Sequence, residues 1–134
     1  MGYTHLVQYY ETDQMGIVHH SNYIRWFEEA RTYWFSQMGC GYREMEEMGV
    51  ISPVLSVKAE YKSMTYFYDE VNIDVMVSHY NGVKLILQYQ VKDLKSGELR
   101  CVGESSHCFL DKDGRIISLK KEYPDIHKLM EQIK

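Results

Sequence analysis

The sequence predicts an α+β domain in which one long, central apolar helix is wrapped by a curved antiparallel sheet of about five strands. Apolar side chains recur at three- and four-residue steps over residues 22–38, which is the period of a buried helix face. From residue 55 onward, apolar and polar residues alternate, which is the period of strands. Turn signals separate the alternating segments, so consecutive strands run antiparallel and one sheet can cover the helix.

Length and composition bound the protein class. The 134 residues suit a single domain, residues 1–134, with a real core, and the net charge of −4 disfavours a broad nucleic-acid-binding surface. No apolar run approaches the ~18 residues of a membrane span, and residues 1–5 lack the pattern of a secretory signal, so we expect a cytoplasmic location. Cys40, Cys101 and Cys108 form no CxxC pair, so we expect reduced, mostly buried thiols.

The first half of the chain is expected to hold a strand and the long helix. Residues 3–10 are β-branched and aromatic with partial alternation, and residues 12–16 break the pattern. Ser21 or Asn22 can serve as the helix N-cap, because a short polar side chain accepts a hydrogen bond from an unpaired N–H. A short second helix is expected over residues 42–48. The apolar stripe of the long helix comprises Tyr23, Phe27, Ala30, Trp34 and Met38, widened by Trp26, Tyr33 and Phe35.

The second half reads as an antiparallel sheet followed by a short helix. Asn81-Gly82 is a strong hairpin signal, because this pair tolerates the positive φ angles of a type I′ turn. Pro124 is expected to open a C-terminal helix. The second face and open edges of a single sheet favour burial by another copy, so we expect a homodimer or homotetramer. The expected strands cover residues 55–62, 71–78, 83–91 and 99–110.

Asp13 is the candidate catalytic residue, because it stands where the first strand gives way to the turn before the helix. Gly16 in the same turn permits close backbone approach or an unusual dihedral angle. The N–H groups of residues 18–23 lie near the helix start, where unpaired donors and the helix dipole favour an anion. A carboxylate there could attack a carbonyl carbon or activate water while the donors stabilise an oxyanion. An Asx-turn or helix-cap role for Asp13 stays open at this point.

Other titratable residues give weaker signals. His20 is a candidate acid or base, and a helix-terminal histidine held by local hydrogen bonds is the alternative. We expect the side chains of His19 and His20 to diverge, and no histidines are spaced as ligands, so no metal site is expected. Glu11, Glu28 and Glu29 could supply a second carboxylate, but we expect them to be surface or salt-bridging residues.

A resemblance to a known family is carried by two motifs, Tyr10-Glu11-Thr12-Asp13-x-x-Gly16-Ile17-Val18-x-His20-x-Asn22-Tyr23 and Arg25-x-Phe27-Glu28-x-Ala30-Arg31. This pattern resembles the 4-hydroxybenzoyl-CoA thioesterase family, in particular its acyl-CoA thioesterase branch associated with the bacterial Tol–Pal system. The likeness is strong over residues 9–34 and weaker to about residue 112.

The resemblance implies a hotdog fold, dimers that often pair into tetramers, and active sites at the dimer interface. It implies hydrolysis of an acyl-CoA thioester to a carboxylate and free CoA, with no metal or redox cofactor. Two other functions on the same fold stay open, a non-catalytic acyl-CoA-binding protein and a hydratase.

The resemblance also assigns roles to residues by position. Asp13 would be the catalytic carboxylate, the backbone N–H of His20 would polarise the thioester carbonyl, and Gly16 would shape the loop. Independently of the resemblance, we expect Val18, Asn22 and Tyr23 near the helix start to contact the substrate. No motif fixes which basic residues would hold the CoA phosphates.

Overall fold

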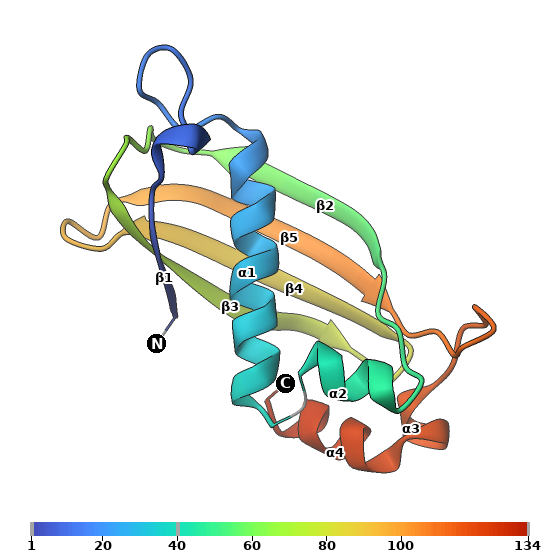
Figure 1. Ribbon diagram of the computed structural model, residues 1–134. Helices are drawn as coiled ribbons and strands as arrows, with labels where there is room; N and C mark the ends of the chain where they lie inside the picture. Colours follow the sequence, from blue (N-terminus) through green and yellow to red (C-terminus); the bar gives the residue numbers. More distant parts are fainter. Residues whose placement is uncertain (1, 40, 134) are drawn as a thin grey trace.

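The fold is a five-stranded antiparallel sheet with one long helix across it, in a computed structural model that describes residues 2–39 and 41–133 (Figure 1). The helix is α1 (Ser21–Gln37), and the strands are β1 (Tyr3–Leu6), β2 (Val54–Tyr61), β3 (Glu70–Tyr80), β4 (Lys84–Asp93) and β5 (Leu99–Cys108). Their order across the sheet is β1-β3-β4-β5-β2, so β1 and β2 form the two edges. The predicted α+β architecture is confirmed.

The hairpin between β3 and β4 forms where predicted but closes differently. Gly82 has a φ of 90°, whereas Asn81 is not among the described residues with positive φ, so the turn is not type I′. The Asn81 side-chain oxygen accepts hydrogen bonds from the N–H groups of Val83 (3.0 Å) and Lys84 (2.8 Å). The Asn81 side chain therefore supplies hydrogen bonds that help to close the turn, which the predicted type I′ turn would close through the backbone alone.

The shorter elements refine the sequence prediction. The predicted strand over residues 3–10 ends at Leu6, because the Gln8 N–H is taken by the Glu11 side chain and the chain curls into a 3₁₀ turn. The helix after α1 and the one opened by Pro124 both form, and a one-turn helix not expected from the sequence precedes the latter. These elements are η1 (Tyr9–Glu11), α2 (Tyr42–Glu47), α3 (Leu119–Glu122) and α4 (Pro124–Gln132).

The core lies between α1 and the sheet. Phe27 of α1 is 1% exposed, and its ring stacks on Tyr89 of β4 with centroids 4.4 Å apart and planes 13° apart. Gly103 of β5 pairs with Tyr89, and a Cβ atom at Gly103 would lie 2.3 Å from the Phe27 ring. Glycine at position 103 therefore lets the helix approach the sheet, and burial of each such aromatic ring contributes about 1.5–3 kcal/mol.

The cysteines match the expectation as far as they are described. Cys101 and Cys108 are free and buried, and burial raises the pKa of the Cys101 thiol to about 12, which keeps it protonated and unreactive. Cys40 lies outside the described residues.

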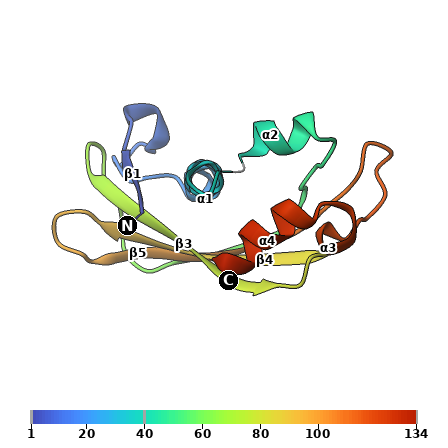
Figure 2. The same ribbon diagram turned by 90° about the horizontal axis from the view of Figure 1, so that it is seen from below.

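The described helices pack against only one of the two faces of the sheet. Figure 2 shows α1 and α2 on the same side of the sheet, and no described helix lies over the opposite face. That opposite face carries half-exposed polar side chains together with Met76. In residues 2–39 and 41–133 no helix is long and apolar enough to cross a membrane.

We predict that Gly103→Ala destabilises the protein by about 1–3 kcal/mol, because the added methyl group would overlap the Phe27 ring and force the helix away from the sheet. Urea unfolding followed by circular dichroism measures this change. Glu104→Ala, one residue further on, is the control and should change the unfolding free energy by less than about 0.5 kcal/mol. Equal stability of Gly103→Ala and the wild type would contradict the packing described here.

Candidate active site

The loop that carries Asp13 is a tight hairpin closed by backbone hydrogen bonds. The Asp13 N–H donates to the Ile17 carbonyl (2.8 Å), and the Gly16 N–H donates to the Asp13 carbonyl (3.0 Å). Gly16 has a φ of 75°, a left-handed conformation that glycine adopts at no steric cost. This backbone conformation is the physical basis for the expected role of Gly16 in shaping the loop.

The Asp13 side chain is exposed and closes the turn with one of its oxygens. Oδ1 accepts hydrogen bonds from the N–H groups of Met15 (2.8 Å) and Ile17 (3.2 Å). The Asx-turn alternative is therefore correct as a description of Oδ1. Oδ2 makes no hydrogen bond with any residue that the structure describes, so the carboxylate keeps an oxygen that can act on a substrate.

A second turn in the chain repeats this geometry. Asp111 accepts hydrogen bonds from Asp113 N–H (2.9 Å) and Arg115 N–H (3.0 Å), and Gly114 has a φ of 79°. Because the turn itself recurs, its shape alone does not mark a site. What distinguishes Asp13 is that its turn precedes α1 in the chain, whereas the Asp111 turn follows β5.

The helix begins without a side-chain cap. His20 occupies the N-cap position and makes no side-chain cap hydrogen bond, so the prediction that Ser21 or Asn22 caps the helix is wrong. Asn22 is buried and turned inward, where its side-chain amide donates to the Glu11 carbonyl (2.8 Å). The His20 backbone N–H has no hydrogen-bond acceptor among the described residues, so a donor stays unused at the positive end of the helix dipole.

The two adjacent histidines do not diverge as expected. Their ring centroids lie 4.1 Å apart with planes tilted by 32°, and His19 Nδ1 lies 2.9 Å from Ser21 Oγ. Because His20 is at the N-cap rather than inside the helix or a strand, the chain turns between the two residues and brings the rings together. In the described part of the chain, no three metal-ligating side chains cluster.

A cavity of about 290 Å³ lies beside the helix start. Tyr61 at the end of β2 lines it, donating its hydroxyl to the His20 carbonyl (3.3 Å) and packing its ring against Tyr23 (5.2 Å between centroids). Val18 and Tyr23 line the cavity, whereas Asp13 and Gly16 lie in the neighbouring loop. The lining residues are Ile17, Val18, His20, Tyr23, Tyr61, Lys62, Ser63 and Met64.

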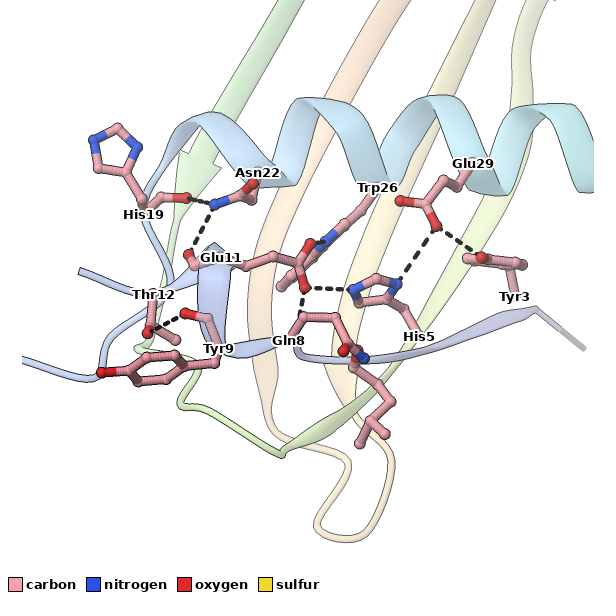
Figure 3. A network of polar contacts seen from close by, with 11 residues as sticks. Tyr3, His5, Gln8, Tyr9, Glu11, Thr12, His19, Asn22, Trp26 and Glu29 are labelled. Atoms are coloured by element: carbon pink, nitrogen blue, oxygen red, sulfur yellow. Dashed lines mark hydrogen bonds and ion pairs between the residues drawn. The ribbon is translucent and has the colours of Figure 1, made fainter.

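The Glu11 carboxylate holds together the chain segments next to the helix start, as Figure 3 shows, and we call these contacts the Glu11 clamp. Its side chain accepts hydrogen bonds from His5 Nε2 (2.8 Å), from the Gln8 N–H (2.8 Å) and from Trp26 Nε1 (2.6 Å). The residue is 4% exposed and its carboxylate lies 2.8 Å from His5 Nε2, so of the two expected roles, surface or salt-bridging, Glu11 has the second. One carboxylate therefore joins β1, η1 and α1.

The backbone of Glu11 fixes the other end of the loop. Its carbonyl oxygen accepts hydrogen bonds from the His19 N–H (2.9 Å) and from Asn22 Nδ2 (2.8 Å). Asp13 follows Glu11 by two residues and His20 follows His19 directly. Glu11 thereby sets where the Asp13 carboxylate and the unused His20 N–H stand relative to each other.

The Glu11 carboxylate stays ionised in spite of its burial. Burial alone would raise its pKa, but the hydrogen bonds from Gln8, His5 and Trp26 together outweigh that effect and lower the pKa below its ordinary value. Glu28 and Glu29, the other two carboxylates expected to be surface or salt-bridging residues, match that expectation in different ways. Glu28 is exposed, while Glu29 accepts a hydrogen bond from the Tyr3 hydroxyl (2.8 Å) and lies 3.5 Å from His5.

Sequence relatives point to one superfamily. A family model for the thioesterase-like superfamily matches residues 7–132. A Bacillus subtilis (strain 168) protein, provisionally named acyl-CoA thioesterase YneP, is 37% identical over 129 residues, which are 96% of this chain and 93% of the relative. An Aquifex aeolicus (strain VF5) protein, provisionally named an esterase, is 34% identical over 94% of this chain and 96% of its own.

Solved structures agree with these relatives. DHNA-CoA thioesterase from Staphylococcus aureus superposes with a TM-score of 0.92 at 31% identity, covering 98% of this chain and 89% of the other. The hotdog fold of these thioesterases is the fold of this chain. The Staphylococcus aureus protein SAV2348, solved in complex with CoA, shares that fold with a TM-score of 0.89 at 16% identity over 98% of this chain and 82% of its own.

We predict that Glu11→Gln lowers the unfolding free energy by about 1–3 kcal/mol at neutral pH, because the buried partners of the carboxylate lose their acceptor for charge-assisted bonds. A carboxylate with a lowered folded-state pKa stabilises the fold above its unfolded pKa, and this stabilisation is lost as pH falls through the lowered value. The stability gap between wild type and variant should therefore be complete above about pH 5 and shrink in stronger acid. Chemical unfolding across pH 2–7 measures it.

Glu47→Gln is the matched control, because Glu47 is exposed on α2. Its unfolding free energy should follow the wild type within about 0.5 kcal/mol. A Glu11→Gln variant as stable as the wild type at pH 7 would show that the clamp does not hold the loop.

Proposed function

The chain belongs to the thioesterase-like superfamily, and we propose from this premise that it hydrolyses an acyl-CoA thioester to a carboxylic acid and free CoA. The observation that supports this most is that the loop carrying Asp13 and the start of α1 are tied together through Glu11. A carboxylate with an unused oxygen, Asp13, and an unused backbone donor, the His20 N–H, are held by the same clamp at Glu11. Thioester hydrolysis needs both groups, one for the carbonyl carbon and one for the carbonyl oxygen.

The proposed reaction places the thioester carbonyl at the helix start. Its oxygen accepts from the His20 N–H, which stabilises the negative charge that develops on that oxygen. Asp13 either attacks the carbonyl carbon or removes a proton from a water molecule that attacks it. The C–S bond then breaks, CoA leaves as a thiolate and takes up a proton, and water completes the carboxylic acid. This scheme uses no metal or redox cofactor.

We propose that the cavity beside the helix binds the thioester and the atoms next to it. Val18 and Tyr23 supply its walls, and Lys62 adds a cation at the same opening. The burial of Asn22 favours a positioning role over the substrate contact expected for it. The placement in the 4-hydroxybenzoyl-CoA and Tol–Pal-associated branch rests on residues 9–34 and stays a prediction, as does a cytoplasmic location.

We further propose that the active unit is a homodimer or a pair of dimers joined through β2. This strand forms a sheet edge, and it exposes Val54, Leu55 and Tyr61 there. An exposed apolar edge strand readily pairs with another strand. Because Tyr61 also lines the cavity at the helix start, a second copy paired along β2 would cover that cavity.

We predict that Asp13→Asn lowers kcat for thioester hydrolysis by about 10²- to 10⁴-fold, because the amide neither attacks the carbonyl nor accepts a proton from water. The asparagine oxygen can still accept the bonds of the turn, so the fold should be retained. Release of the CoA thiol across short-chain, long-chain and aromatic acyl-CoAs measures the rate. Binding without turnover by the wild type would favour the non-catalytic alternative, and hydration of an enoyl-CoA would favour the hydratase.

Asp111→Asn is the matched control, since it makes the same change in a turn of the same geometry away from α1. It should keep the wild-type kcat. His20→Ala should also retain most of the activity, because the proposed donor is the backbone N–H, which alanine keeps. Near-full kcat in Asp13→Asn would remove Asp13 from the mechanism.

We predict that Leu55→Lys shifts the protein toward monomers, because a lysine on the β2 edge opposes pairing with a second copy. Sedimentation velocity at micromolar concentration measures the distribution. Leu94→Lys changes another exposed leucine, in the turn after β4, and should leave the distribution unchanged. Identical sedimentation of both variants and the wild type would place the interface elsewhere.

A further inference from the structure

We propose that a second cavity, between α1 and β2, binds the far end of the acyl group and selects a hydroxyl group there. The proposal rests on the proposed thioesterase function, and it names the class of acyl group the site takes: medium-chain acyl groups with a hydroxyl near the end of the chain. The cavity has a volume of about 200 Å³. It is lined by Ile24, Phe27, Glu28 and Arg31 of α1, Val54 and Val57 of β2, and Ser105 of β5.

The cavity continues the line that starts at the proposed oxyanion donor. His20, Ile24, Phe27 and Arg31 follow one another at three- and four-residue steps, so they lie on one face of α1. Both cavities are bounded by this helix face and by β2, the first by its end at Tyr61 and the second by its earlier residues. An acyl chain that leaves the thioester along this seam therefore meets apolar walls first and Arg31 last.

A chain of polar contacts reaches the inner end of the cavity. Arg31 Nη1 lies 3.0 Å from the Tyr89 hydroxyl oxygen, which lies 2.6 Å from Ser105 Oγ, which in turn lies 2.7 Å from His107 Nε2. All four residues are buried, although they come from three different elements. Such a chain inside an apolar core is costly unless each donor meets an acceptor.

The direction of these hydrogen bonds follows from His107. Burial, with a further contribution from Arg31, lowers the pKa of His107 to about 4, so the ring is neutral at pH 7. Nε2 faces Ser105, the Pro53 backbone interacts with the ring, and Nδ1 has no hydrogen-bond partner among the described groups; because proline offers only a carbonyl acceptor, we assign the ring proton to Nδ1 and treat Nε2 as an acceptor. Ser105 must then donate to His107, Tyr89 donates to Ser105, and Arg31 donates to Tyr89.

This direction decides what the end of the cavity offers a ligand. The hydroxyl hydrogen of Ser105 is committed to His107, so Ser105 can only accept, while the Arg31 guanidinium can only donate. A hydroxyl group satisfies both, because it accepts from Arg31 and donates to Ser105. A carboxylate would face the lone pair of Ser105 and the exposed carboxylate of Glu28, which disfavours a dicarboxylic acyl group.

The distance along α1 sets the length of the acyl group. Eleven residues separate His20 from Arg31, which at 1.5 Å per residue is about 16 Å, and the arginine side chain points back toward the helix start and shortens this to roughly 10–16 Å. An extended chain advances about 1.2 Å per bond, so roughly 8–13 bonds span the gap. A single aromatic ring with one hydroxyl is too short to reach both ends.

The test compares two CoA thioesters of equal length, decanoyl-CoA and 10-hydroxydecanoyl-CoA, with the intact protein. The wild type should hydrolyse the hydroxylated ester with a kcat/KM about tenfold or more above that of decanoyl-CoA, since a site built around a hydroxyl discriminates against its absence. Ser105→Ala removes the acceptor and Arg31→Gln removes the cation, and each should bring the two esters to within about twofold. Arg25→Gln, an exposed arginine of the same helix, should keep the wild-type ratio.

The outcomes are separable from the proposed function. Hydrolysis of both esters at equal kcat/KM, or a preference that survives Ser105→Ala, overturns the hydroxyl site while leaving the thioesterase intact. A preference for 9-carboxynonanoyl-CoA over both overturns the assigned hydrogen-bond direction. If neither ester is hydrolysed, calorimetric affinities of the two esters for the wild-type protein decide the same question without turnover. If Arg31→Gln does not fold, Ser105→Ala alone is decisive.

Discussion

The buried carboxylate of Glu11 is the interaction on which the candidate site depends. Its side chain is held by His5, Gln8 and Trp26, and its carbonyl holds His19 and Asn22. An unpaired buried carboxylate would be strongly destabilising, so the three donors must stay in place for the fold to form. The same requirement fixes the loop between Glu11 and α1, which is the loop that carries Asp13. Stability and the geometry of the site are therefore coupled through one residue.

Asp13 and Asp111 lie in turns of the same geometry, but only the Asp13 turn leads to the start of a long helix. Both aspartates close a turn with two backbone N–H groups and a left-handed glycine. Only the first turn leads into a long helix whose His20 N–H is left without an acceptor among the described residues. A carboxylate and an oxyanion donor on opposite sides of a carbonyl form an acyl-transfer site. The thioesterase-like superfamily to which the chain belongs agrees with that chemistry.

The sequence predicts the parts of the structure that depend on local periodicity. The helix over residues 22–38, the alternating strands and the turn glycines follow from patterns within a few residues of each other. The burial of Glu11 was not predicted, because the groups that bind its carboxylate come from separate elements, which no local pattern reveals; a buried Trp26 in need of an acceptor was the available signal. The Arg31 and Ser105 contacts were missed for the same reason, since the two residues meet only after the sheet covers the helix.

The central claim is that a thioester carbonyl binds at the start of α1, between Asp13 and the His20 N–H. The most direct measurement is a crystal structure with an unreactive acyl-CoA analogue in which a methylene group replaces the thioester sulfur. We expect the carbonyl oxygen of the analogue at about 2.7–3.1 Å from the His20 nitrogen, with the Asp13 carboxylate facing the carbonyl carbon. An analogue bound with its carbonyl away from the helix start, and with Asp13 turned to solvent, would contradict the account.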